Sequence, residues 1–293
     1  MKISLLICTR NRAEQLRACL ARLNEVIQPE SPVEIVLVDN GSSDGTAAVI
    51  NSFSSSTKWD VLSVSAERQG LGHARNCGIK ASSGDLIIFT DDDCYLEEKY
   101  FLNFLGRFDP SSCQYGMGQI LLHDCEDDAR VANMRVAESV LIPPRTAVIP
   151  AGMVQGANMF FLRSVFEKAG LFNEEMGAGT QFPCEDIEMA CRASHSGFTG
   201  AMLPGFTIYH HHGRKKNSAE ALQAIRDYDF GRGAYYASLL ARGVPNVWEF
   251  WQTSFTQNKR ITSLDSLDRL SRELAGASRY FELAVRKARA GGG

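Results

Sequence analysis

The sequence predicts an α/β protein built on a largely parallel sheet. In roughly the first 100 residues, apolar runs alternate with polar turns and with segments whose apolar residues recur at the helical period. The apolar runs are near-continuous stretches of Val, Ile and Leu, which is typical of parallel strands covered by helices on both faces. Of the 293 residues, 44% are hydrophobic and 22% are charged, so the chain can bury a core of this kind.

The elements of the first half follow in a regular order. After the first strand, Leu16, Leu20, Leu23 and Ile27 repeat at helical spacing, so we expect one helix to present them on one face. Asp44 stands where a side-chain oxygen caps the start of a second helix. The expected strands lie at 2–8, 33–38, 60–64 and 85–89, with a third helix at 72–81 between the last two.

The pattern changes after about residue 115. Strand-like segments are expected at 198–210, broken at Pro204-Gly205 because proline cannot donate to a sheet ladder. From Ser218 onward the pattern is mainly helical. The remaining expected elements are a strand at 156–162 and helices at 164–169 and 185–194. One apolar stripe on the last helix, which we expect to pack on another surface, consists of Leu267, Leu270, Leu274, Phe281 and Val285.

Charge is distributed unevenly along the chain. The net charge is −3, but from Gly213 to the end there are 14 Lys and Arg against 8 Asp and Glu, so the rest is acidic. This distribution does not favour a nucleic-acid partner. The basic tail fits either peripheral contact with an anionic membrane or a helical appendage packed on the core or on a second subunit. The aromatic residues of that tail are Trp248, Phe250, Trp251 and Phe255, near Lys259 and Arg260.

Cysteine spacing and hydropathy exclude other classes. The eight cysteines form no Cys-x-x-Cys pair, so we expect no zinc site, and most should be reduced core residues. No apolar run approaches the roughly 20 residues of a membrane-spanning helix, and the first residues turn polar too early for a secretory signal. We therefore expect a cytoplasmic protein, at most peripheral at the inner face of the membrane.

Polar clusters follow three of the expected strands: Cys8 to Arg10, Asp39 to Gly41, and Asp91 to Asp93. Ligands bind at the carboxyl ends of the strands in such sheets, so these clusters should converge on one rim. Because side chains alternate along an extended chain, Asp91 and Asp93 should project together and could hold Mg²⁺ or Mn²⁺, which can bind a diphosphate. The alternative is a solvated acidic turn.

Two further clusters admit a structural and a functional interpretation. Glu185 and Asp186 are favoured in a first helical turn by the helix dipole alone. His210, His211 and His212 alternate in direction, so at least one should face the rim, where a neutral imidazole can ligate a metal. Asp39 is not needed by a simple turn, and its carboxylate could accept the N–H of a nucleotide base.

Seven segments taken in order resemble a family-2 glycosyltransferase with the GT-A fold. The resemblance runs from about residue 2 to 214. It rests on Thr9-Arg10-Asn11-Arg12, VDNGSSDGT, Gly72-His73-Ala74-Arg75-Asn76, FTDDD, Gly156-Ala157-Asn158 with MFFLRSVFEKAGLFNE, Glu185-Asp186, and His210.

The resemblance implies a site that binds a nucleotide-sugar donor and a divalent metal, Mn²⁺ or Mg²⁺. Its nucleotide residues would be Thr9 and Asp39 at the base, usually uracil, with Arg12, Arg75, Asp91 and Asp92. Its metal ligands would be Asp93 and Asp91, with His210 or His212; His210 lies 24 residues past Asp186.

The resemblance also implies an inverting transfer to a hydroxyl of a glycan or lipid-linked saccharide, commonly in polysaccharide assembly. Asp186 would be the catalytic base, Glu185 would support the acceptor site, and Gly156 and Asn158 would lie near the sugars. The expected organisation is a GT-A domain at 1–213, with a nucleotide-binding half at about 1–115 and an acceptor-binding half at about 116–213. A helical extension at 214–293 completes the chain, and a homo-oligomer is compatible with it.

Two other functions compete with this interpretation. A sugar nucleotidyltransferase shares an α/β nucleotide-binding core, but it normally needs a glycine-rich phosphate loop, and the segment from Thr9 to Arg12 contains no glycine. A catalytically inactive nucleotide-binding scaffold would keep the fold without turnover. Release of pyrophosphate from a nucleoside triphosphate would indicate the first, and absence of single-turnover sugar transfer the second.

Overall fold

A computed structural model describes residues 1–257, 260–261 and 263–290. Within these residues, nine strands form one sheet in the order β3-β2-β1-β4-β8-β6-β9-β5, with β7 beside β9. Lys259, which the sequence analysis placed near a membrane surface, lies outside the described residues. The strands are β1 (Ile3–Thr9), β2 (Val33–Asp39), β3 (Asp60–Ser65), β4 (Leu86–Asp91), β5 (Cys94–Leu96), β6 (Tyr115–Leu122), β7 (Val140–Ile142), β8 (Met159–Leu162) and β9 (Gly200–His210).

The first four strands are parallel, as the apolar runs predict. In register, Thr9 of β1 lies beside Asp39 of β2, and Cys8 lies beside Asp91 of β4. The three predicted polar clusters therefore end at one edge of the sheet. Alternate residues of β1 enter separate cores: Leu5 packs with α1 and α2 on one face, whereas Leu6 packs with α3 on the other.

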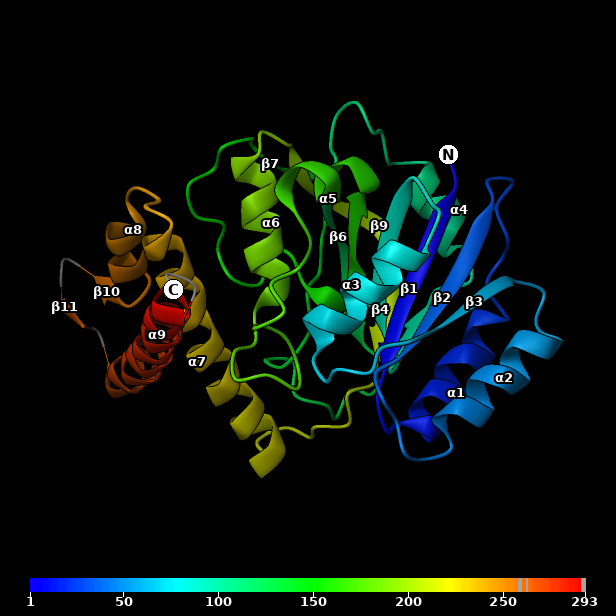
Figure 1. Ribbon diagram of the computed structural model, residues 1–293, viewed down its shortest axis with the longest axis horizontal. Helices are drawn as coiled ribbons and strands as arrows, with labels where there is room; N and C mark the ends of the chain where they lie inside the picture. Colours follow the sequence, from blue (N-terminus) through cyan, green and yellow to red (C-terminus); the bar gives the residue numbers. More distant parts are fainter. Residues whose placement is uncertain (258–259, 262, 291–293) are drawn as a thin grey trace.

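Helices cover both faces of the sheet (Figure 1). Asp44 does not take the N-cap position of α2, which is Gly45; its carboxylate instead accepts the Thr46 N–H at 3.0 Å and the Ala13 N–H at 3.2 Å. It therefore ties together the starts of two helices. The helices of this part are α1 (Ala13–Leu23), α2 (Thr46–Ser56), α3 (Leu71–Ala81), α4 (Tyr100–Leu105), α5 (Arg163–Ala169) and α6 (Glu185–His195).

Three predicted boundaries differ from the structure. Helix α1 ends at Leu23, so Ile27 lies beyond it and Val26 is buried instead. Residues 156–158 form a 3₁₀ turn before β8 rather than part of the strand. Strand β9 is continuous through Pro204-Gly205, and the expected break is a register shift against β6 between Met117 and Gln119. A bulge absorbs the extra residues without ending the strand.

The C-terminal extension is helical, as predicted, and consists of α7 (Ala219–Ala241), α8 (Val247–Thr253) and α9 (Leu264–Ala290), with a short β10–β11 pair, Thr256–Gln257 and Arg260–Ile261. Helices α7 and α9 run side by side at one end of the molecule (Figure 1). A Cβ on Gly231 of α7 would lie 2.6 Å from the Pro183 carbonyl oxygen. Glycine there lets α7 cross directly over the segment that precedes α6.

The apolar stripe of α9, which we expect to pack on another surface, is covered within the described chain only at Leu270. Helix α9 packs on α7 through Glu273, Gly276 and Ala277. The two backbones approach closely because Gly233 of α7 and Gly276 of α9 have no side chain at the contact. Four members of the stripe stay exposed: Leu267, Leu274, Phe281 and Val285.

The aromatic residues proposed for membrane contact are divided between the core and the surface. Trp251 and Phe255 are buried, and Phe250 packs on the same core, whereas Trp248 remains 56% exposed. No helix in the described ranges is both long and apolar enough to cross a bilayer.

A buried carboxylate holds the extension together. Glu273 is fully buried; its Oε2 accepts the Trp251 indole N–H at 2.5 Å, and its Oε1 lies 2.7 Å from Nε of Arg232. Arg269 approaches the same oxygen at 3.2 Å. One side chain therefore joins α7, α8 and α9.

We predict that Glu273→Leu lowers the free energy of unfolding by about 3–5 kcal/mol, because it leaves the partly buried Arg232 without its main partner. The exposed Glu14, paired with Arg17 on α1, provides the control. Glu14→Leu should change stability by less than about 1 kcal/mol. Urea unfolding followed by circular dichroism measures both, and equal effects of the two substitutions would contradict the role of Glu273.

Candidate active site

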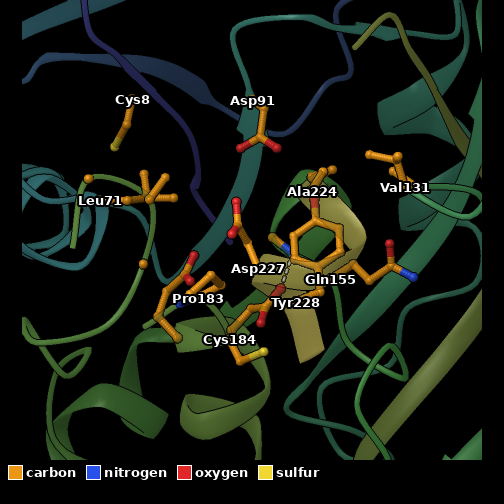
Figure 2. A pocket seen from close by; sticks show the side chains of 18 of the residues that line it. Cys8, Leu71, Asp91, Val131, Gln155, Pro183, Cys184, Ala224, Asp227 and Tyr228 are labelled. Atoms are coloured by element: carbon orange, nitrogen blue, oxygen red, sulfur yellow. Dashed lines mark hydrogen bonds between the residues drawn. The ribbon is translucent and has the colours of Figure 1, made fainter. Parts of the chain in front are cut away.

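A pocket of about 860 Å³ opens at the carboxyl ends of β1 and β4. Its walls come from these strand ends, from the start of α6 and from α7. Figure 2 shows the ring of Tyr228 inside this pocket, between Asp91 and Cys184. The sheet and the C-terminal extension therefore enclose one cavity.

Asp92 turns toward the first strand, away from its two neighbours. Thr9 Oγ1 donates to Asp92 Oδ2 at 2.7 Å, and Arg12 Nε donates to Asp92 Oδ1 at 2.8 Å. Burial raises the pKa of Asp92 to about 6, against the opposing charge of Arg12. Of the predicted nucleotide-binding residues, Thr9 and Arg12 thus both bind Asp92.

Asp91 and Asp93 project toward His210, which is the predicted grouping, although Asp92 and Asp93 form the turn between β4 and β5 rather than part of an extended strand. Together with Cys94, these residues bring their ligand atoms within 4.8 Å of one another, and His210 Nε2 lies 3.0 Å from Asp93 Oδ1. Burial raises the pKa of Asp91. Burial acts to raise the pKa of Asp93, but the hydrogen bond from His210 and the charges of His210, Arg12 and Arg214 together outweigh it, so the pKa is lowered.

The chemistry of this cluster fits a hard divalent cation. Carboxylate oxygens with one imidazole are ligands that Mn²⁺ and Mg²⁺ accept. Cys94 is the exception, because burial raises its thiol pKa well above the ordinary value and only a thiolate binds metal well. The residues that would hold the cation are therefore Asp91, Asp93 and His210.

Arg75 links the two sides of the pocket. It is only 2% exposed; its guanidinium is ion-paired with Glu185 and lies 3.8 Å from Asp91. The guanidinium carbon of Arg75, Cζ, lies 5.5 Å from the centre of the Phe172 ring. A Cβ on Gly156 would lie 2.4 Å from an Arg75 nitrogen, so only glycine leaves room for the guanidinium there.

Asp186 lies in the first turn of helix α6 and lines the pocket. Its Oδ2 accepts the Gly156 N–H at 2.8 Å and its Oδ1 the Ile187 N–H at 2.7 Å. Burial and then the neighbouring Glu185 charge raise the pKa of Asp186 to about 7, whereas Arg75 lowers it. A carboxylate with a pKa near neutrality can accept and release a proton at physiological pH.

Three predicted site residues, all in the described part of the chain, do not line the pocket. Asp39 accepts the Ser42 N–H at 2.9 Å and so closes the turn after β2, whereas its neighbour Asn40 reaches the pocket. The side chain of His212 is fully buried 3.9 Å from Asp127. Asn158 is also buried, and it accepts the Tyr100 hydroxyl at 2.6 Å.

The sequence did not predict that residues of α7 and of the segment before it line the pocket. Tyr228, Asp227 and Arg214 all line the cavity. Burial raises the pKa of the Tyr228 hydroxyl to about 12, so it stays protonated. No catalytic motif marks these residues, and the available signal was the pair Gly231 and Gly233, which indicates close backbone approach in mid-helix.

Sequence comparison shows a match to the family described as Glycosyl transferase family 2 over residues 4–170. The curated relatives include glycosyltransferase AglE of Haloferax volcanii, 26% identical over 199 residues, which are 67% of this chain and 62% of that protein. They also include the putative glycosyltransferase EpsH of Bacillus subtilis, 29% identical over 56% of this chain and 48% of that protein. The chain thus spans about half to three fifths of these relatives.

Comparison with solved structures shows a similar fold at low identity. The mannosyltransferase PcManGT of Pyrobaculum calidifontis, in complex with GDP-Man and Mn²⁺, has a TM-score of 0.58 at 16% identity, over 99% of this chain and 76% of that one. S. aureus TarS 1–349 in complex with UDP-GlcNAc has a TM-score of 0.55 at 15% identity, over 83% of this chain and 72% of that one. The predicted GT-A-type α/β fold is thereby confirmed.

We predict that His210→Ala and Asp93→Ala each weaken binding of Mn²⁺ alone at least tenfold, because each removes a ligand. The control is His211→Ala, since His211 is an exposed neighbour outside the cluster. Competition with a metal-sensitive dye measures the affinities. Unchanged affinity in both site variants would exclude this cluster as the metal site.

Proposed function

Because this chain belongs to glycosyl transferase family 2, we propose that it transfers a sugar from a UDP-linked donor to a hydroxyl of a saccharide acceptor. The observation that carries the proposal is one pocket that holds two separate acidic centres. One is the cation-type cluster at Asp91, Asp93 and His210, and the other is Asp186 with its pKa near neutrality. Departure of a diphosphate and deprotonation of an acceptor need these two chemistries in one cavity.

The donor nucleotide occupies the rim of the proposed nucleotide-binding half, at about residues 1–115. Thr9, Arg12 and Asp92 form a connected polar floor there, and Asn40 and Arg75 complete it. The solved neighbours support nucleotide-sugar binding by this fold with two different bases, since one holds GDP-Man and the other UDP-GlcNAc. We assign UDP to this chain.

A divalent cation on Asp91, Asp93 and His210 would supply Lewis-acid stabilisation of the charge that develops on the leaving diphosphate. Arg12 and Arg75 neutralise the surrounding carboxylates and orient them toward the pocket. Arg214, also in the lining, is positioned to attract the phosphates by charge. These three cations explain how an acidic rim can accept an anionic donor.

Asp186 acts as the general base. Its Oδ2 is oriented by the Gly156 N–H, and Glu185, held by Arg75, keeps the pKa of Asp186 high by its charge. As an acceptor hydroxyl attacks the anomeric carbon, Asp186 takes its proton. A single displacement inverts the anomeric configuration, and NMR of the product should show a configuration opposite to that of the donor.

The acceptor enters between the proposed acceptor-binding half, about 116–213, and α7. Tyr228 offers an aromatic face on which a sugar ring can stack, and Asp227 offers a carboxylate for sugar hydroxyls. An aromatic platform beside polar groups suits a saccharide, whether a free glycan or one linked to a lipid. The extension at 214–293 is therefore part of the site rather than a separate module.

We expect UDP to bind in calorimetric titration with Mn²⁺ or Mg²⁺ and at least tenfold more weakly in EDTA, because a cation held by Asp91, Asp93 and His210 would supply the positive charge that attracts the diphosphate. GDP, CDP and dTDP, titrated in parallel, test the choice of base. Preference for GDP would leave the transferase assignment intact but change the donor. If no nucleoside diphosphate bound, the donor site would be wrong.

Asp186→Asn should abolish turnover, with a loss of roughly 10²–10⁴ in kcat, because an amide cannot take the proton. The affinity for UDP should stay nearly unchanged. The matched control is Asp60→Asn, at an exposed carboxylate of β3 outside the pocket lining, which should leave kcat unchanged. If Asp186→Asn kept most of its activity, another residue would be the base.

The pH dependence of kcat/KM follows from the raised pKa of Asp186. The base works only when deprotonated, so kcat/KM should rise with pH and level off above about 7. Below that pH it should fall about tenfold per pH unit. Rates measured between pH 5 and 9, with donor saturating and acceptor dilute, test this, and a profile flat down to pH 5 would contradict it.

A further inference from the structure

Helix α9 carries an apolar seam that no other part of the described chain covers. Leu267, Leu274 and Phe281 follow at intervals of seven residues and are 49%, 45% and 39% exposed. Leu264 and Val285 extend the same line and are also exposed. Apolar side chains in a continuous row on a surface indicate a contact with another surface, because their exposure to water is unfavourable.

The spacing of this seam is that of a coiled coil. A seven-residue apolar repeat keeps one stripe of a helix facing a second helix. Helix α9 has 27 residues, which is about 40 Å and enough for three heptads. The face that packs on α7, at Glu273, Gly276 and Ala277, is a different one, so the seam stays available. Between the large residues the seam carries two exposed serines, Ser271 and Ser278.

We propose that two copies of this chain associate by pairing their α9 seams in antiparallel orientation. Side-chain sizes support this arrangement. With the helices antiparallel about a two-fold axis at the level of Gly276, Leu274 meets Ser278 of the partner subunit, and Phe281 meets Ser271 of the partner subunit. These central layers each set a large side chain against a small one, which fills space without overlap, and Leu267 meets the apolar Val285 of the partner subunit.

The charges of α9 also favour the antiparallel arrangement. Its first turns carry Asp265 and Asp268, whereas its last turns carry Arg286 and Arg289. Antiparallel pairing brings the acidic end of one helix to the basic end of the other, and parallel pairing would bring like charges together.

A lipid surface is a weaker candidate than a second copy of the chain for the partner of the α9 seam. Two of the basic side chains of α9 that could attract anionic headgroups are engaged within the chain: Arg272 lies 2.8 Å from Asp229, and Lys287 lies 2.6 Å from Glu175. Exposed acidic residues, Asp268 and Glu282, stand beside the seam. A membrane-binding helix typically has basic residues at those positions.

Sedimentation velocity of the full chain over a range of concentrations tests the proposal without any substrate. We expect a species of twice the mass of one chain. The double variant Leu274→Glu with Phe281→Glu should raise the dimer dissociation constant at least 100-fold, because it buries carboxylates in the seam. The control is Leu141→Glu, at a side chain 61% exposed on β7, which should remain dimeric.

Thermal melts must show that the variants stay folded; since all substituted side chains are exposed, we expect unchanged transitions. A wild-type chain that is monomeric at every concentration overturns the proposal, as does a double variant that remains dimeric. A monomer that binds anionic vesicles, and loses that binding in the double variant, also overturns it and assigns the seam to lipid.

A spin label tests the orientation. The label is attached at Asp265→Cys in a Cys125→Ser background, which removes the exposed thiol. Electron–electron distance measurement on the dimer should give about 30 Å between labels in the antiparallel arrangement. About 10 Å would indicate parallel helices and overturn the proposed orientation.

Discussion

The buried guanidinium of Arg75 is the interaction on which the site depends. A cation that is almost inaccessible to water must be compensated, and Arg75 has carboxylates on two sides, Glu185 from α6 and Asp91 from β4. The two carboxylates lie 94 residues apart in the chain. Arg75 therefore holds the start of α6 against the end of β4, and the position of Asp186, the residue after Glu185, follows from it.

The remaining carboxylates of the pocket are only partly compensated. Burial raises the pKa values of Asp91, Asp92 and Asp186, whereas at Asp93 the effect of burial is outweighed by His210 and the nearby arginines together, and the pKa is lowered. Burying carboxylates that are not fully compensated destabilises the protein without ligand, but it favours the binding of a cation. A divalent cation gains most where carboxylates lack positive partners, and a base is most effective where its proton affinity has been raised.

The C-terminal extension repeats the same principle at a second place. Glu273 is a buried carboxylate that forms ion pairs with Arg232 and Arg269 and accepts a hydrogen bond from the Trp251 indole, and it so fixes α7 against α8 and α9. Since α7 carries Tyr228 into the pocket, the order of the extension is coupled to the shape of the site. Helix α9, which packs on α7, presents the exposed heptad seam on another face.

The sequence by itself determined the parallel half of the fold and the acidic rim. Apolar runs of Val, Ile and Leu define strands locally, which is a property of neighbouring residues. The grouping of Asp91 with Asp93, away from Asp92, was also predicted, although the turn between β4 and β5 produces it rather than an extended strand. The sequence also singled out Asp186 by its motif, although a motif alone could not reveal that burial raises the pKa of this carboxylate.

Only the tertiary structure decided which polar residues share the pocket. Asp39, Asn158 and His212 have suitable chemistry, yet their side chains close a turn or enter the core, whereas Tyr228 and Asp227 reach the site from a helix with no motif. The physical reason is that long-range packing fixes where a helix lies. Close contacts at Gly231 and Gly276 place α7 over the pocket and turn the apolar stripe of α9 outward, and such contacts between distant segments leave no periodic trace in the sequence.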